Sequence, residues 1–289
     1  MTGGESPRLF DRALRRRRAA RWLPRFPEHD VLHAHAAALA AEKLLDVTRS
    51  FTRACIWGDR GRHLLSLLPP AKVDAAVHAD DVALPDGTTV VADAEASPFA
   101  DEAFDLAVSL LDLHAANDPI GAMIQIARSL KPDGLFIGVM FGAETLNELR
   151  AVLAEAEIET AGGLSPRVFP FADVRDAGSL LQRAGFALPV ADEDRLTVRY
   201  GDPLRLLADL RAAGESNVLT ERRRAFLRRD TLGQALAGYS ARFHDGGRFR
   251  ATFSFLTLTG WRPHQSQPQA LKPGSGQVSL VQALKDVRS

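Results

Sequence analysis

The candidate ligand-binding residues of this chain each follow a short apolar run. Gly58 and Gly61 flank Arg60 in a turn that comes directly after the first run. Glycine lets a backbone approach a ligand closely, and the N–H groups of a following helix can bind a polar group there. Arg60 has two possible roles: its side chain could block a pocket at this turn, or it could reach the carboxylate of a ligand.

The second and third apolar runs end in aspartates. Asp80 and Asp81 follow the run 73–79, and Asp93 follows the run 88–92. An ionised carboxylate is a strong hydrogen-bond acceptor. We therefore expect Asp80 or Asp81 to accept hydrogen bonds from ribose hydroxyls, with a helix N-cap or a solvated turn as the alternative.

His114 stands at the end of the fourth apolar run and is the candidate catalytic residue. An imidazole at this place could act as a general base or orient a substrate, and a hydrogen bond to a neighbouring loop is the alternative. His33 and His35 are two positions apart and do not share a helix face. Because no other spacing suggests two histidines and a carboxylate, the sequence predicts no metal site.

The elements that must position these residues alternate between apolar strands and helices. Strands are expected at 52–59, 73–79, 88–92, 105–111 and 135–141, and further strands within 186–200 and at 248–261. Nearly continuous apolar strands are typical of a parallel sheet covered on both faces, whereas the alternation in the last strand indicates antiparallel pairing. The sequence predicts an α/β fold: a doubly wound, mostly parallel, seven-stranded Rossmann-like sheet with an antiparallel edge strand. Ligands of such sheets bind outside the carboxyl ends of the strands.

Composition divides the chain into three parts. Residues 1–44 are expected to form an N-terminal helical segment, and residues 45–263 the α/β domain. A helical lid is expected as an insertion at about 202–245, from helices at 203–213 and 221–243. Residues 264–289 are rich in Gln, Pro, Gly and Ser and are expected to form an extended tail.

The bulk properties limit the classes of partner. The chain has 289 residues, with 36 basic against 36 acidic side chains, so net charge gives no general attraction to nucleic acid or anionic membranes. The single cysteine, Cys55, excludes an internal disulfide. No apolar run reaches the roughly 18 residues that span a bilayer, and no secretory signal is recognisable. The sequence predicts a cytosolic protein without a membrane span and does not define its oligomeric state.

Longer motifs suggest a family. SLLDLHAANDP at 109–119 and the LKPDG turn that opens 130–150 resemble the fourth and fifth strands of class I S-adenosylmethionine-dependent methyltransferases. Further motifs share a likeness to one branch of that superfamily: LFDR at 9–12, GGLSPRVFPF at 162–171, LLQRAGF at 180–186, GESN at 214–217, RRDT at 228–231, GW at 260–261 and HQSQ at 264–267. Together they are similar to the complex I assembly factors that hydroxylate a protein arginine, and to their alphaproteobacterial methyltransferase-like relatives.

The resemblance implies a cofactor and a set of contacts. S-adenosylmethionine is the expected cofactor, with Asp93 near the adenine amino group and Ala94 and Leu111 completing the site formed by Gly58, Arg60, Gly61 and Asp80. The expected function is methyl transfer to a protein substrate resembling a complex I subunit. Because methyl transfer needs mainly positioning, the lack of a catalytic triad does not contradict this function. Two alternatives remain: a protein-arginine hydroxylase, and a non-catalytic assembly factor with a degenerate cofactor pocket.

Overall fold

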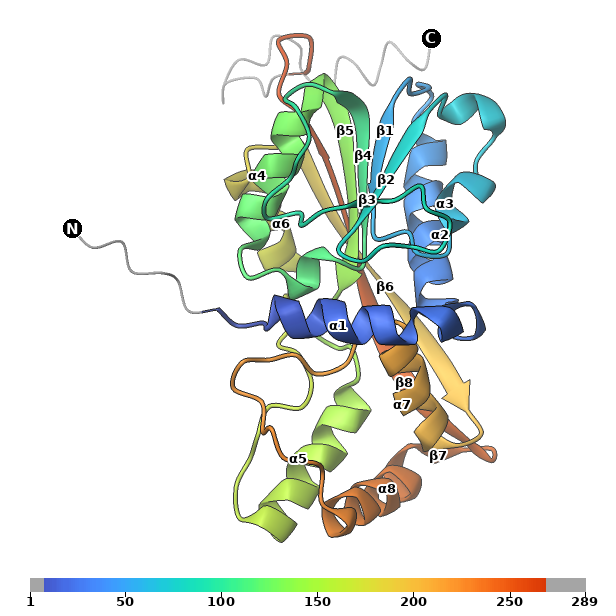
Figure 1. Cartoon of the computed structure of the whole chain (residues 1–289), viewed down its shortest axis with the longest axis vertical. Helices are drawn as coiled ribbons and strands as arrows, with labels where there is room; N and C mark the ends of the chain where they lie inside the picture. Colours follow the sequence, from blue (N-terminus) through green and yellow to red (C-terminus); the bar gives the residue numbers. More distant parts are fainter. Residues whose placement is uncertain (1–7, 269–289) are drawn as a thin grey trace, which may run out of the picture.

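The computed structural model describes residues 8–268, which form one mixed sheet with helices on both faces and at one end (Figure 1). The helices are α1 (Arg12–Trp22), α2 (Val31–Asp46), α3 (His63–Ser66), α4 (Pro119–Ser129), α5 (Asn147–Ala161), α6 (Val174–Arg183), α7 (Pro203–Ala212) and α8 (Arg229–Phe243), with 3-10 turns η1 (Leu23–Glu28), η2 (Pro70–Lys72) and η3 (Leu113–Ala115). The strands are β1 (Ala54–Trp57), β2 (Ala76–Asp80), β3 (Val90–Val91), β4 (Phe104–Leu110), β5 (Leu130–Phe141), β6 (Ala187–Tyr200), β7 (His244–Asp245) and β8 (Arg248–Trp261).

The strand order is β3-β2-β1-β4-β5-β8-β6, with the two-residue strand β7 paired to β8 as an addition to the predicted seven. Strands β1 to β5 pair in parallel, and β8 runs antiparallel to both β5 and β6. The predicted doubly wound sheet with antiparallel pairing at one edge is therefore confirmed. Every residue of β1 and β4 is buried, as the nearly continuous apolar runs indicated.

Two apolar clusters hold the helices against the sheet. One cluster joins α2 and α3 to one face of β1, β4 and β5, and it continues to α5, α7 and α8 beyond the sheet. The other joins α4 and α6 to the opposite face. Figure 1 shows α1 lying across the sheet between this α/β part and α5, α7 and α8.

Several predicted boundaries are wrong for local physical reasons. The helix expected at 221–243 begins only at Arg229, because the backbone of Arg228 is extended and ends the helical run there. Residues 221–228 instead form a loop, in which Phe226 is fully exposed. The helix that follows Gly61 is the short helix α3. It begins only at His63, because Arg62 adopts a left-handed conformation. The predicted tail lies outside the described residues beyond residue 268.

Candidate functional site

Two glycines determine the backbone of the turn after β1, and a side chain at either would meet a different neighbour. Gly58 has φ of +76°, and a Cβ at this position would come well under 3.0 Å from the backbone carbonyl of Leu110 in the neighbouring strand β4. A Cβ at Gly61 would collide with the ring of His63. Asp59, between them, accepts hydrogen bonds from the backbone N–H groups of His63 and Leu64 at the start of α3. The backbone of the turn therefore packs closely against β4, and the Asp59 carboxylate binds N–H groups of the protein.

Arg60 projects from this turn into the carboxylates that end β2. Its Nε lies 3.0 Å from Asp80 Oδ2 and its Nη2 lies 3.0 Å from Asp81 Oδ1. All three side chains are buried. Burial raises the pKa of Asp80 to about 6, against the opposing effect of Arg60. Burial alone would also raise the pKa of Asp81, but Arg15 and Arg60 hold it well below its ordinary value.

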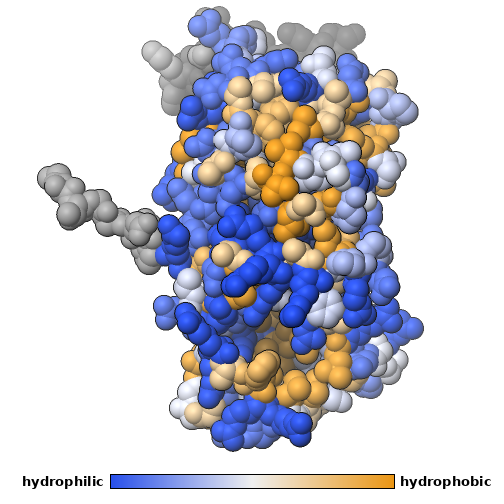
Figure 2. All heavy atoms as spheres, viewed as in Figure 1, coloured by the Kyte–Doolittle hydropathy of each residue, from blue (hydrophilic) through white to orange (hydrophobic). Residues whose placement is uncertain are grey.

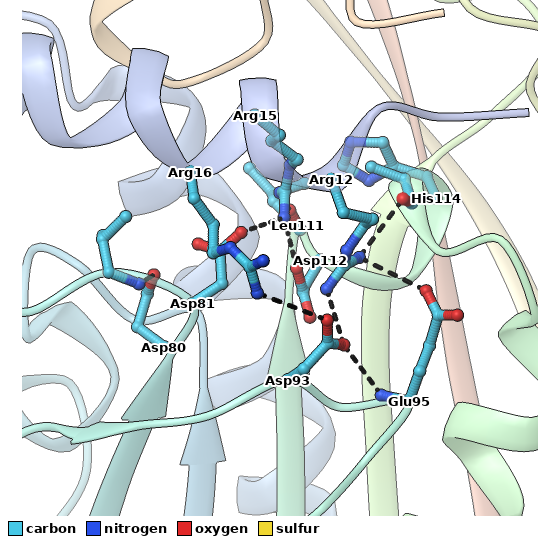
Figure 3. A network of polar contacts seen from close by, with 12 residues as sticks. Arg12, Arg15, Arg16, Asp80, Asp81, Asp93, Glu95, Leu111, Asp112 and His114 are labelled. Carbon is cyan, nitrogen blue, oxygen red and sulfur yellow. Dashed lines mark hydrogen bonds and ion pairs between the residues drawn. The ribbon is translucent and has the colours of Figure 1, made fainter. Parts of the chain in front are cut away.

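A crevice lies between the turn after β1, the ends of β2 and β4, and Arg15 of α1. The guanidinium of Arg15 reaches one of the two carboxylates, that of Asp81 (Figure 3). Its Nη1 donates to Asp112 Oδ1 at 2.6 Å and to Asp81 Oδ2 at 3.2 Å. Its Nη2 donates to the carbonyl of Leu111 at 3.2 Å. The guanidinium is thus held by two acids and one backbone oxygen, although only 2% of the side chain is exposed.

Asp93 is also engaged by α1, at the rim of the crevice. Arg12 Nη2 donates to its Oδ1 at 2.8 Å, and Arg16 Nη1 lies 3.8 Å from its Oδ2. The neighbouring Ala94 is buried. Figure 3 shows the side chains of Arg12, Arg15 and Arg16 leaving one helix toward acids that follow β2, β3 and β4. The predicted site residues are therefore gathered at the carboxyl ends of the strands, but Arg60 pairs with Asp80, and arginines of α1 pair with Asp93.

His114 forms a buried pair that sequence reasoning missed. Its Nε2 lies 2.9 Å from Glu215 Oε2, and the rings of Phe141 and Phe171 pack around the imidazole. Burial would raise the pKa of Glu215, but His114, with Arg15 and His33, lowers it below its ordinary value. Within residues 8–268, His114 Nδ1 and Glu215 Oε1 have no hydrogen-bond partner. The GESN motif was the available signal for Glu215, although its spacing from His114 gave no hint of contact.

The crevice between these groups has almost no free space. Its walls are Gly58, Leu110 and Leu111 with the side chains of Arg15, His33 and Arg60 and the acids that they hold, and essentially no room remains for a water molecule. The acids are of the type that binds an adenosine, but in this arrangement their oxygens are taken by arginines. S-adenosylmethionine does not fit the crevice as it stands. The predicted cofactor roles of these residues, and the catalytic role of His114, stay predictions.

Residues 8–268 contain neither a candidate metal site nor a membrane-spanning helix. No cluster of three or more His, Cys, Asp or Glu side chains is arranged to hold a metal ion in this part of the chain. Across the same residues, no helix has the length and apolar character needed to cross a bilayer.

Comparison with known proteins defines the class first. Residues 63–138 match the family model described as a methyltransferase domain. The solved structure of YcgJ from Bacillus subtilis matches 80% of this chain and 99% of its own, with a TM-score of 0.54 at 15% identity. A Bacillus halodurans protein assigned as a methyltransferase matches 78% of this chain and 99% of its own, with a TM-score of 0.52 at 16% identity. The fold is that of the class I methyltransferase superfamily.

The sequence relatives are more specific. The mitochondrial arginine-hydroxylase NDUFAF5 of Danio rerio is 37% identical over 96% of this chain and 90% of its own length. The Homo sapiens protein of the same name is 38% identical over 96% of this chain and 85% of its own. A malonyl-[acyl-carrier protein] O-methyltransferase of Halorhodospira halophila is 35% identical over 60% of this chain. The chain belongs to the NDUFAF5 arginine-hydroxylase family.

The family corrects one expectation from the sequence. The NDUFAF5 relatives are named as mitochondrial proteins, and this finding contradicts the predicted cytosolic location. The prediction failed because neutral net charge and a single cysteine are equally compatible with both compartments.

Proposed function

We propose that this protein is a methyltransferase-like assembly factor for respiratory complex I that acts by binding a protein partner. Its nucleotide crevice is closed by its own arginines. Membership of the NDUFAF5 family supports the assembly role. The proposal that the crevice is closed depends on one observation. Two arginines occupy the acidic crevice, Arg60 from the turn after β1 and Arg15 from α1.

The closed crevice argues against methyl transfer in this conformation. A cofactor with an adenosine group would need oxygens of Asp80 and Asp93 that Arg60 and Arg12 now occupy. Opening the crevice would remove Arg15 and Arg60 from carboxylates in a desolvated site. Breaking buried ion pairs of this kind is strongly unfavourable unless new partners replace them. We therefore derive no catalytic step that uses S-adenosylmethionine.

A second candidate function has its own supporting observation. Asp81, Asp112 and the Leu111 carbonyl already bind both terminal nitrogens of one guanidinium group, and its Nε has no partner. The relatives are named arginine hydroxylases, so the crevice holds a side chain of the residue type that their name says they modify. An arginine of a partner protein could take the place of Arg15 if α1 moved aside.

Calorimetric titration with S-adenosylmethionine and S-adenosylhomocysteine tests the first proposal. The wild-type protein is expected to show no binding at millimolar ligand, and Arg60→Ala is expected to bind more tightly than wild type because it frees Asp80. Arg16→Ala is the matched control, since Arg16 lies outside the closed crevice. Tight binding by wild type that Arg60→Ala abolishes would contradict the proposal and make Arg60 a cofactor ligand.

Intact-mass analysis distinguishes the two candidates. An arginine-containing peptide from a complex I subunit is incubated with the protein and a cell extract that supplies small-molecule cofactors. An unchanged peptide mass supports a binding role. A gain of one oxygen atom supports the arginine-directed enzyme, and a gain of one methyl group would contradict both candidates.

A further inference from the structure

A second cavity lies away from the crevice, among the helices beyond α1. It is enclosed by α5, α7, α8, the loop before α6, and the ends of β5 and β8. Water-sized molecules can reach about 280 Å³ of it, whereas the crevice has essentially none. Figure 2 shows the surface hollowed in this part of the molecule, with apolar side chains around the hollow and hydrophilic ones above it.

The walls of this cavity are mainly aliphatic and aromatic. Leu149, Val152 and Leu153 come from α5, and Leu232, Leu236 and Tyr239 from α8. Protein interiors are normally packed with few voids larger than a water molecule. An apolar cavity of about 150 Å³ binds benzene, so 280 Å³ holds roughly ten carbon atoms at the same packing. The space therefore suits an aliphatic chain.

The mouth of the cavity is basic. Arg167, Arg211, Asn217 and Leu227 line both the cavity and an adjoining groove, which continues to Arg18 and to the arginines at 222–224. Arg167 pairs with Glu157, and Arg222 lies 3.5 Å from Asp11. Within residues 8–268, Arg211, Arg223 and Arg224 have no acidic partner. The groove thus presents several guanidinium groups with few acids to neutralise them.

The acid in the wall does not cancel this charge. Among the residues that line the cavity, Glu215 is the acidic one, and its carboxylate is bonded to His114 at the crevice end. An apolar chamber with a cationic mouth is complementary to a ligand that has an aliphatic tail and an anionic head.

We propose that this cavity binds the acyl chain of an anionic lipid-like molecule, with the carboxylate or phosphate of the ligand held by Arg211 and the arginines of the 222–224 loop. The cavity shares no lining residue with the crevice, so its occupation can be measured without S-adenosylmethionine or a protein partner. It goes beyond the proposed function by giving the assembly factor a small-molecule ligand of defined chemistry. A free fatty acid and an acyl phosphate ester share this chemistry.

Titration calorimetry with hexanoate, octanoate, decanoate and dodecanoate, all below their micelle concentrations, tests the proposal. Each methylene is expected to tighten binding by about fourfold up to roughly ten carbons, and the affinity should then level off. Decanol is expected to bind at least tenfold more weakly than decanoate because it lacks the charge. Lysophosphatidic acid with a decanoyl chain is titrated for comparison with decanoate. Tighter binding of decanoate indicates a free fatty acid as the ligand, and tighter binding of the lysophosphatidic acid indicates an acyl phosphate ester.

Two variants locate the ligand. Leu236→Trp fills the cavity from α8 and is expected to weaken decanoate binding more than tenfold, while exposed Leu67→Trp is its matched control. Arg211→Gln is expected to weaken decanoate about fivefold and decanol not at all, with exposed Arg183→Gln as its control. Thermal melting confirms that each variant is folded.

Three outcomes would overturn the proposal. The first is no binding of any acid or phosphate ester in the series. The second is binding that Leu236→Trp and Arg211→Gln leave unchanged. The third is failure of every lipid together with tight binding of an amphipathic helical peptide, which would make this cavity a protein-docking groove.

Discussion

Replacing Arg15 by methionine tests the closed crevice through the free energy of unfolding. Methionine keeps an unbranched apolar stem of similar length but removes the guanidinium from Asp81, Asp112 and the Leu111 carbonyl. Removing one partner of a buried ion pair costs about 3–5 kcal/mol, because an uncompensated charge is left in a desolvated site. Asp81 keeps Arg60 as a partner, so we expect the lower end, about 3 kcal/mol.

Arg16→Met is the matched control, one position along the same helix. The Arg16 side chain is 46% exposed, and its partner Asp93 keeps Arg12 at 2.8 Å. Exposed ion pairs contribute about 0–1 kcal/mol. The two variants should therefore differ by at least about 2 kcal/mol.

Urea denaturation at neutral pH, followed by circular dichroism, measures this difference. The double variant Arg15→Met, Asp112→Asn is expected to recover part of the loss, because it also removes the unpaired carboxylate. Equal costs for Arg15→Met and Arg16→Met would refute the reasoning. So would a double variant whose loss of stability equals the sum of the losses measured for Arg15→Met alone and Asp112→Asn alone.

Further predictions concern the turn after β1 and the buried histidine of α2. Gly58→Ala should cost at least about 3 kcal/mol in urea denaturation, because strain at positive φ adds to the collision with Leu110, whereas Gly87→Ala, with open space around it, should cost about 1 kcal/mol; similar costs would contradict this. Burial, aided by Arg60, lowers the pKa of His33 to about 3. The unfolded chain therefore takes up a proton near its ordinary pKa of about 6.5 while the folded protein does not, so stability should fall as the pH drops. Between pH 6.5 and about pH 5, wild type should lose about 1.6 kcal/mol relative to His33→Leu, and an unchanged difference would refute a neutral buried His33.

The sheet could be predicted from the sequence because its strands form short apolar runs that are recognisable locally. The run that forms β4 is apolar except for Asp105 and Ser109 and is wholly buried. Residues 131–134, expected as a turn, form the partly exposed start of β5, ahead of its buried half. The loop at 221–228 was missed because the spacing of apolar residues does not reveal that the backbone of Arg228 is extended. Helix boundaries depend on such local effects more than on periodicity.

The candidate site was only partly predictable. Its acids could be found because each follows an apolar strand, and Arg60 stands out in a glycine turn. The contacts of Arg15 could not be found, since it meets Asp81 and Asp112 across 66 and 97 positions of sequence. The pairing of His114 with Glu215 spans 101 positions and has the same explanation. Long-range ion pairs are set by how helices pack, which local sequence does not specify.

A crystal structure of the wild-type protein grown with millimolar S-adenosylhomocysteine tests the closed crevice most directly. Arg15 is expected to remain on Asp81 and Asp112, and Arg60 on Asp80, with no ligand between them. Electron density for the nucleoside lying between Asp80 and Asp93, with α1 displaced, would contradict it.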